Sequence, residues 1–272
     1  MNPAPITKPT KRRNIQNLFV DPRNKTQTMS RPNISDLLSL LALVALLLSL
    51  AGTTQAAPDD ERRIVPAEDI LGKIEKGEPV NYDNVIVVGD LNLSEVDLPT
   101  RHVERTGEEI LWWGLTEEAK TVKSPINITS SEIQGDVTFS NVIFQKSVDF
   151  KETNFSGGNA DFGGAEFSGA ANFRESYFGE MAQFDSVTFN DSANFSYAQF
   201  SDRAYFEEST FNGSTDFEEA QFKGNAYFEG STFHGDLNLT RTGYLRLFLR
   251  WNSIRDQQLW LCRKINWQMF IR

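Results

Sequence analysis

Phenylalanine recurs along this chain at intervals of five and six residues. Eighteen of the 21 phenylalanines fall between Phe139 and Phe233, and the gaps between successive ones are nine fives, seven sixes and one seven. A small or β-branched residue stands two positions before almost every one of them, as in Ala193-Asn194-Phe195. This stretch is therefore an internal repeat, and few folds can bury so regular a pattern.

The spacing excludes an α-helical repeat. Residues five apart on an α-helix are separated by about 140°, so the phenylalanines would not form one apolar stripe. In an extended segment, by contrast, residues i−2 and i point to one side and residue i−1 to the other. The small residue and the Phe then face inward together. Strands this short bury their side chains only when successive segments are wound into stacked coils.

Four segments of 5, 6, 5 and 6 residues make a coil of 22, and this period sorts the core into columns. The columns are Phe173, Phe195, Phe217 and Leu239; Phe178, Phe200, Phe222 and Tyr244; Phe184, Phe206 and Phe228; and Phe167, Phe189, Phe211 and Phe233. We expect each sixth residue to bulge at a corner or along one face. The same rhythm continues upstream in aliphatic form from Tyr82 to Leu98 and resumes at Ile128.

The (Ala/Ser/Thr/Val)-x-Phe-x-x units resemble pentapeptide repeats over about 165 residues, from Val80 to Tyr244. The resemblance implies an all-β fold, a right-handed four-sided parallel β-helix with about 22 residues per coil. The stretch from Ala67 to Ile74 begins with acidic residues and has helical apolar spacing. It predicts a short helical cap over the N-terminal end.

The chain divides into four predicted parts. Residues 1–57 form a basic tail and a signal peptide or anchor, and residues 58–79 form a linker and the helical cap. Residues 80–244 form the β-helix, with an insertion at 99–125, and residues 245–272 form a basic, aromatic C-terminal segment. The C-terminal segment has three interpretations: a membrane-surface segment, a cap, or the stump of a longer chain.

The apolar run from Leu37 to Ala51 has the layout of a secretory signal and is short for a membrane span. We therefore expect export, with Met29 as an alternative start and an uncleaved membrane anchor as the alternative to cleavage. On an exported chain the seven Asn-x-Ser/Thr sequons that follow the apolar run would be acceptors for N-glycans. They begin at Asn92, Asn127, Asn154, Asn190, Asn194, Asn212 and Asn238.

The charge is unevenly distributed. Residues 128–239 carry 18 acidic and 5 basic side chains, a net charge of −13, whereas residues 240–272 carry 1 acidic and 7 basic, a net of +6. An acidic β-helix resembles the members of this family that imitate duplex DNA and inhibit DNA topoisomerases. Acidity also serves solubility alone, and an exported chain would not meet DNA.

The sequence offers little for catalysis. The two histidines, His102 and His234, are separated by several predicted coils, and Cys262 is the single cysteine. No grouping of nucleophile, base and orienting residue follows from the spacing, and no His/Cys set has metal-ligand spacing. We therefore expect no catalytic, cofactor-binding or metal-binding residues and no cofactor.

The insertion contains two adjacent tryptophans, Trp112 and Trp113, in a stretch that favours a short helix. Large aromatic residues are enriched at protein interfaces. These two residues are therefore the candidate contacts for a protein partner. The alternative is that they pack onto the side of the β-helix and cover the insertion.

The leading hypothesis is a non-enzymatic, exported or membrane-associated repeat scaffold for protein interaction at the cell surface, with a homodimer as one form of that interaction and no nucleic acid as a partner. The first alternative is a cytosolic DNA mimic that binds a topoisomerase. The second is ligand or ice binding by an outward ladder of side chains such as Thr188, Thr210 and Thr232. A row of only three threonines is better explained by β-propensity and side-chain stacking.

Overall fold

The computed structural model describes residues 62–243, 247–249 and 270–271. All of these belong to the second of the two compact units of the chain, Asp60–Arg272. The apolar run at 37–51, the proposed start at Met29, and Tyr244 and most of the C-terminal segment lie outside the described residues.

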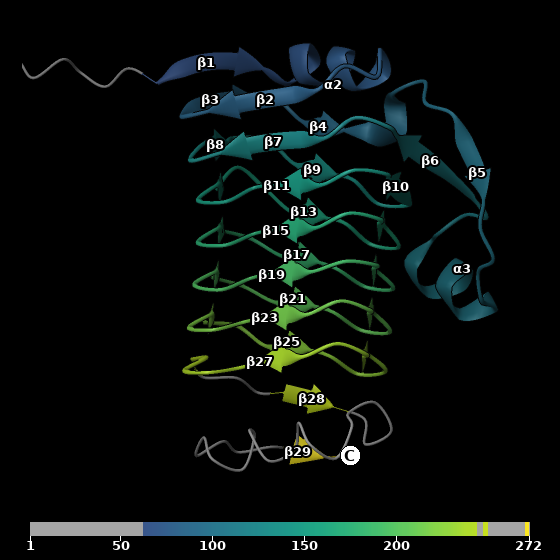
Figure 1. Ribbon diagram of the computed structural model, residues 1–272, viewed down its shortest axis with the longest axis vertical. Helices are drawn as coiled ribbons and strands as arrows, with labels where there is room; N and C mark the ends of the chain where they lie inside the picture. The colour runs from purple at the N-terminus through teal and green to yellow at the C-terminus, as the bar shows by residue number, and fades with distance from the viewer. Residues whose placement is uncertain (1–61, 244–246, 250–269, 272) are drawn as a thin grey trace, which may run out of the picture. The chain divides into compact units, whose positions relative to one another are not determined.

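Four sheets, named A to D, form the sides of the coil (Figure 1). The chain passes through them in the repeating order B, A, C, D. Sheet A contains β1 (Arg63–Pro66), β3 (Val85–Val88), β8 (Glu132–Ile133), β12 (Asn154–Phe155), β16 (Tyr177–Phe178), β20 (Gln199–Phe200) and β24 (Gln221–Phe222). Sheet B contains β2 (Val80–Asp83), β7 (Ile126–Thr129), β11 (Val148–Asp149), β15 (Ala171–Asn172), β19 (Ala193–Asn194), β23 (Thr215–Asp216) and β27 (Leu237–Asn238).

The other two sheets complete the coil. Sheet C contains β4 (Leu91–Asn92), β9 (Val137–Thr138), β13 (Ala160–Asp161), β17 (Ala182–Gln183), β21 (Ala204–Tyr205), β25 (Ala226–Tyr227), β28 (Leu247–Leu249) and β29 (Phe270–Ile271). Sheet D contains β5 (Thr100–His102), β6 (Glu118–Val122), β10 (Val142–Phe144), β14 (Glu166–Phe167), β18 (Thr188–Phe189), β22 (Thr210–Phe211) and β26 (Thr232–Phe233). Two α-helices, α2 (Ala67–Glu75) and α3 (Gly107–Trp113), and the 3₁₀ turn η1 (Leu93–Glu95) accompany the sheets.

The predicted register is confirmed. Asn172, Asn194 and Asp216 pair in succession at steps of 22 residues. The step is 23 only across the single seven-residue gap, where Phe144 pairs with Phe167. One additional residue at one corner therefore lengthens one coil without shifting the columns.

Each Phe column is a stack of nearly parallel rings. Phe178 and Phe200 have ring centroids 4.8 Å apart at an interplanar angle of 3°. Rings of neighbouring columns meet edge to face, as Phe184 and Phe195 do at 5.3 Å and 86°. Both geometries are favourable for aromatic pairs, because the ring edge is positive and the face negative. The coil interior is thus one continuous aromatic core.

The small residues also face inward, as the alternation requires. Ala171 and Ala193 are fully buried, and Asn172 and Asn194 between them and the Phe are half-buried. Where Ser precedes a core aromatic residue in this way, at Ser176, Ser209 and Ser231, its hydroxyl donates to a carbonyl oxygen of the preceding coil, as Ser176 Oγ does to Phe150 O at 2.9 Å. These bonds remove the penalty for burying a hydroxyl group.

The sixth residues are accommodated at corners. They lie between sheets A and C and between sheets D and B, where successive inward Phe residues are six positions apart, as Phe178 and Phe184 are. The other two corners turn through a left-handed residue, such as Glu175 with a φ of 59° and Ser186 with a φ of 53°. Sequence spacing alone did not distinguish these two kinds of corner.

The N-terminal end is closed by α2, as predicted. Its buried residues, Ala67, Ile70 and Ile74, join the core cluster of the coil. The preceding strand β1 was not predicted. It pairs with β3 in parallel, with Val65 beside Val87, and this pairing adds one strand to sheet A.

The insertion is shorter than the predicted range of 99–125. Strand β6 is already part of the coil, because Val122 pairs with Phe144 in register and is fully buried. Residues 99–117 therefore leave the coil and return to it, with β5 lying antiparallel against β6. Strand β6 was not recognised from the sequence because it has an aliphatic residue, Val122, where the repeat pattern has phenylalanine.

Candidate functional site

The insertion carries the helix α3, which the sequence predicted. Thr106 Oγ1 accepts from Glu109 N at 3.1 Å, and a Glu109 carboxylate oxygen accepts from Thr106 N at 2.6 Å. This reciprocal capping box defines the first turn. Gly114, with a φ of 64°, ends the helix in the left-handed conformation that glycine adopts easily.

Arg105 fixes the insertion to the coil. Its Nη2 donates to Asn141 Oδ1 at 2.8 Å and to Gly164 O at 2.6 Å, and its Nη1 pairs with Glu109 at 3.3 Å. The side chain is 9% exposed, so these charge-assisted bonds are well shielded from water. Arg105 therefore connects α3 to two consecutive coils.

Leu115 adds an apolar contact directly after α3. It is 4% exposed, and its side chain lies over Gly164. A Cβ at Gly164 would come within 2.4 Å of Leu115 Cδ1, and the φ of Gly164 is +65°. Only glycine fits this corner, because any side chain would displace the insertion.

The last turn of α3 is apolar and exposed. Leu111 is 75% exposed and Trp112 is 73% exposed, and Ile110 beside them is also exposed. Of the five exposed large apolar residues in the described part of the chain, three are consecutive here. Trp113 is half-buried. The two predicted contact residues therefore differ: one points to solvent, and the other is partly covered.

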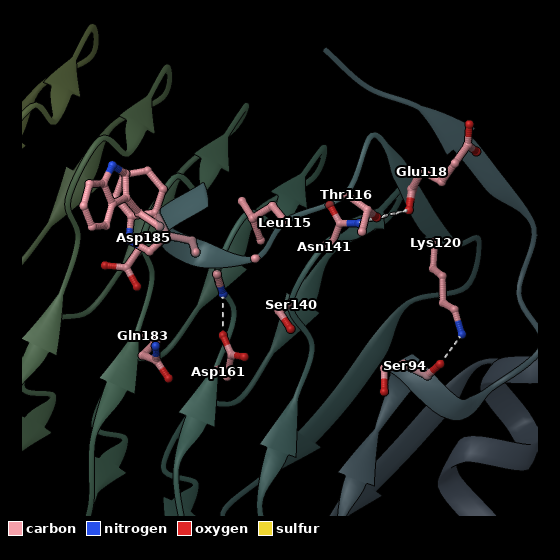
Figure 2. A pocket seen from close by; sticks show the side chains of 14 residues that line it. Ser94, Leu115, Thr116, Glu118, Lys120, Ser140, Asn141, Asp161, Gln183 and Asp185 are labelled. Carbon is pink, nitrogen blue, oxygen red and sulfur yellow. Dashed lines mark hydrogen bonds between the residues drawn. The ribbon is translucent and has the colours of Figure 1, made fainter. Parts of the chain in front are cut away.

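A groove of about 380 Å³ lies between α3 and sheet C. Trp112, Trp113 and Leu115 line it from the insertion, and Asp161 and Asp185 line it from the coil. Figure 2 shows the two carboxylates on neighbouring coils, facing the insertion together with Gln183 and Ser140. The groove thus combines aromatic and acidic walls.

Asp185 is the most unusual ionisable group of the groove. Asp185 is 3% exposed, and burial raises the pKa of its carboxyl group to about 7. The carboxylates of Glu207 and Asp161 act in the same direction, and a hydrogen bond from Gln183 opposes them. Burial also raises the pKa of Asp161, against a 2.8 Å hydrogen bond from Gly163 N.

The sequence family follows from the coil rather than from the groove. A family model described as pentapeptide repeats in 9 copies matches residues 128–177, 173–219 and 195–243. Residues 128–243 are pentapeptide repeats. Such repeats form right-handed β-helices, so the predicted fold class is confirmed. No curated protein and no solved structure matches the chain.

The pentapeptide repeats contain the coil side of the groove, but the family pattern does not include the insertion, which precedes residue 128. Members of the family are generally non-enzymatic structural repeat proteins. The repeats establish a scaffold. The chemistry particular to this chain lies where residues 99–117 meet the repeats.

The acidic pair Asp161 and Asp185 was not identified from the sequence. The residues are 24 apart, one coil of 22 plus two positions, which brings the residue before Phe162 close to the residue after Phe184 on the next coil. This offset was a usable signal. Nothing in the sequence, however, indicated that the insertion would cover this corner of the repeats.

The other predicted features are placed clearly. His102 is in β5 and His234 directly follows β26, and these strands are at opposite ends of sheet D. Thr188, Thr210 and Thr232 pair in register as the predicted row. Among the described residues, no group of three or more His, Cys, Asp and Glu is placed to hold a metal ion. Neither described helix is long and apolar enough to cross a membrane.

Proposed function

We propose that this protein is a non-enzymatic scaffold that is exported to the cell surface and binds a partner protein through α3. The observation that carries the proposal is the exposed apolar last turn of that helix, which contains Ile110, Leu111 and Trp112. Monomeric proteins rarely leave consecutive large apolar residues so exposed on a rigidly held helix.

The surroundings of α3 define the chemistry of the partner. Glu108 and Glu109 occupy the first turn, and Asp161 and Asp185 lie in the adjoining groove. A complementary surface is apolar at its centre and basic around it, because opposite charges at the rim speed association and disfavour other partners. The partner is therefore a protein with a basic rim around an apolar pocket that accepts Leu111 and Trp112.

Attachment to a rigid coil favours binding. Arg105 and Leu115 hold α3 against two coils, so little conformational entropy is lost from this side when a partner binds. The repeats then act as a spacer that presents the helix. Among the sequon asparagines in the described part of the chain, Asn190 and Asn212 are the exposed ones, and they are the proposed glycan acceptors.

The binding test compares the full-length wild-type chain with a Leu111→Ser/Trp112→Ser variant and with Ile64→Ser as control. Ile64 is another exposed apolar residue, 66% exposed and located on β1. Each tagged chain is expressed in the native host, cross-linked at the cell surface and recovered. One surface protein retained by wild type and Ile64→Ser but lost from the double variant supports the proposal.

An unchanged set of cross-linked proteins in the double variant would overturn it. Sedimentation velocity of the purified chain distinguishes a second copy as the partner, since a dimer would dissociate in the double variant.

Export is tested separately by intact mass and N-terminal sequencing of cytosolic, membrane and external fractions. A chain starting near Ala57 outside the cytosol supports export, whereas an unprocessed cytosolic chain overturns it and makes topoisomerase inhibition the next assay.

A further inference from the structure

The groove beside α3 contains a carboxylate oxygen without a hydrogen-bond partner. Asp185 is 3% exposed, and its Oδ1 accepts no hydrogen bond within the described residues. A buried carboxylate oxygen without a donor is strongly destabilising, and native structures rarely tolerate one without a reason. Because Asp185 lines the wall of an open groove, a small rotation of its carboxyl group would bring Oδ1 within reach of a donor bound in the groove.

The chain itself does not supply that donor. Lys120 lines the same groove, but its Nζ donates to the carbonyl oxygens of Leu93, Ser94 and Val96 at distances between 2.6 and 3.1 Å. The terminal nitrogens of Arg105 are engaged as well, with Asn141, Gly164 and Glu109, and its Nε is buried without a partner. Both nearby cations therefore hold the groove together and face other acceptors.

The neighbouring carboxylates determine the charge of a ligand. Glu207 and Asp161 both interact electrostatically with Asp185. Three carboxyl groups in one region disfavour an anion and favour a cation, and this preference is strengthened where water is excluded. A positively charged donor would satisfy Asp185 Oδ1 and reduce the repulsion among these groups.

The opposite wall selects the type of cation. Trp112 and Trp113 line the groove, and the faces of indole rings attract ammonium and guanidinium groups. A divalent metal ion would instead require several oxygen ligands in one shell. The described residues place no group of three or more suitable side chains together. Aromatic rings beside a buried carboxylate therefore match an organic cation.

We propose that the groove between α3 and sheet C binds an organic cation, an ammonium or guanidinium group that donates to Asp185 Oδ1 and lies against the tryptophans of α3. The cation comes either from a Lys or Arg side chain of a protein or from a free small amine. The site does not depend on the partner protein proposed above, because a free amine would occupy the same groove.

The test is a calorimetric titration of the full-length chain at pH 8 with four probes. Two represent a protein side chain, N-acetyl-lysine methylamide and N-acetyl-arginine methylamide. The third, butylamine, is a free amine, and the fourth, N-acetyl-norleucine methylamide, is a neutral analogue of the lysine probe. We expect at least one cation to bind about 10-fold or more tightly than the neutral analogue, since the analogue leaves Asp185 unpaired.

Three variants locate the binding. Asp185→Asn should weaken cation binding by about 10-fold or more, and Trp112→Ala by about 2- to 5-fold. Trp112 is largely exposed, so its truncation tests the site without disturbing the fold. The matched control is Asp216→Asn, which removes the same charge from sheet B, where Asn172, Asn194 and Asn238 occupy the equivalent positions. It should leave cation affinity unchanged.

The outcomes separate clearly. Tighter binding of a blocked amino acid than of butylamine assigns the site to a protein side chain, and the reverse assigns it to a free amine. Equal affinity for the norleucine analogue, no binding of any cation, or equal losses in Asp185→Asn and Asp216→Asn would each overturn the proposal. Trp112 belongs to both sites, so Leu111→Ser, which leaves the groove lining intact, separates the two proposals. It should lose the cross-linked protein and retain cation affinity, whichever way the titration of Asp185→Asn turns out.

Discussion

The regular coils and the insertion are stabilised in opposite ways. In the coils the same contacts recur every 22 residues, as in the stack of Phe173, Phe195 and Phe217 with centroids about 5 Å apart. The insertion is held by contacts that occur once, chiefly those of Arg105 and Leu115. A repeat therefore spreads its stability over many similar interactions, whereas an insertion into it depends on a few specific ones.

The largest expected effect tests the repeated core. Phe195→Ala should lower the free energy of unfolding by about 3–5 kcal/mol, because it removes a ring stacked on both sides and leaves a cavity. Asn194→Ala, one position away, should lower it by about 1 kcal/mol or less, through loss of the bonds that its Oδ1 accepts from Ser196. Denaturant unfolding measures both. Equal losses would contradict the inward and outward assignment.

The next effect concerns charge at the junction of the two regions. The pKa of Asp185 is raised to about 7 in the folded chain, above an ordinary value of 3.8. The folded state therefore retains a proton that the unfolded state has lost. The contribution of Asp185 to the free energy of unfolding is fully present below about pH 4 and is lost as the pH rises through about 7.

Asp185→Asn should abolish that loss. We expect the variant to be more stable than wild type at pH 8.5 by on the order of 2–4 kcal/mol and similar to it at pH 4. Glu207 and Asp161 interact electrostatically with Asp185, and the pKa of each is also raised. These two groups make the free energy of unfolding decrease with rising pH in both proteins. Thermal unfolding across this pH range measures the difference. A constant difference between the two proteins would contradict the raised pKa.

A smaller effect separates the insertion from the coil. Arg105→Met removes the bonds to Asn141 and Gly164, and the free energy of local opening of residues 103–117 should fall by about 1–3 kcal/mol. Hydrogen exchange should accelerate there and stay slow in residues 160–239. Arg203→Met, at an exposed position on the coil, is the control. Faster exchange throughout the coil would show that the two regions unfold together.

The smallest effect tests whether the exposed side of α3 serves stability. Leu111→Ser should change the free energy of unfolding by less than about 0.5 kcal/mol, because Leu111 is exposed and packs little. The same denaturant assay applies. A large loss would mean that this side is structural and would remove the basis of the proposed interaction. Ile64→Ser provides the comparison.

Much of the fold could be predicted because the information in the repeat is local. An inward Ala and an inward Phe with an outward Asn between them define one side of the coil. The period of 22 places identical residues of successive coils beside each other, as with Asn172 and Asn194. What departs from the repeat was harder to place. Strand β6 reads Glu-Ala-Lys-Thr-Val, with Val122 where later coils have Phe, so its place in sheet D was recognised only in the structure.

The sequence by itself determined the four-sided coil, its columns and its helical cap, because each follows from side-chain alternation and the stacking of like residues. The tertiary structure alone decided where the insertion lies and which acids it covers. Asp185 follows a core Phe just as Glu207 does, yet only Asp185 lines the groove with the tryptophans. Burial of a charge depends on what packs over it, and that contact joins residues some 70 positions apart in a chain whose repeat is only 22 residues long.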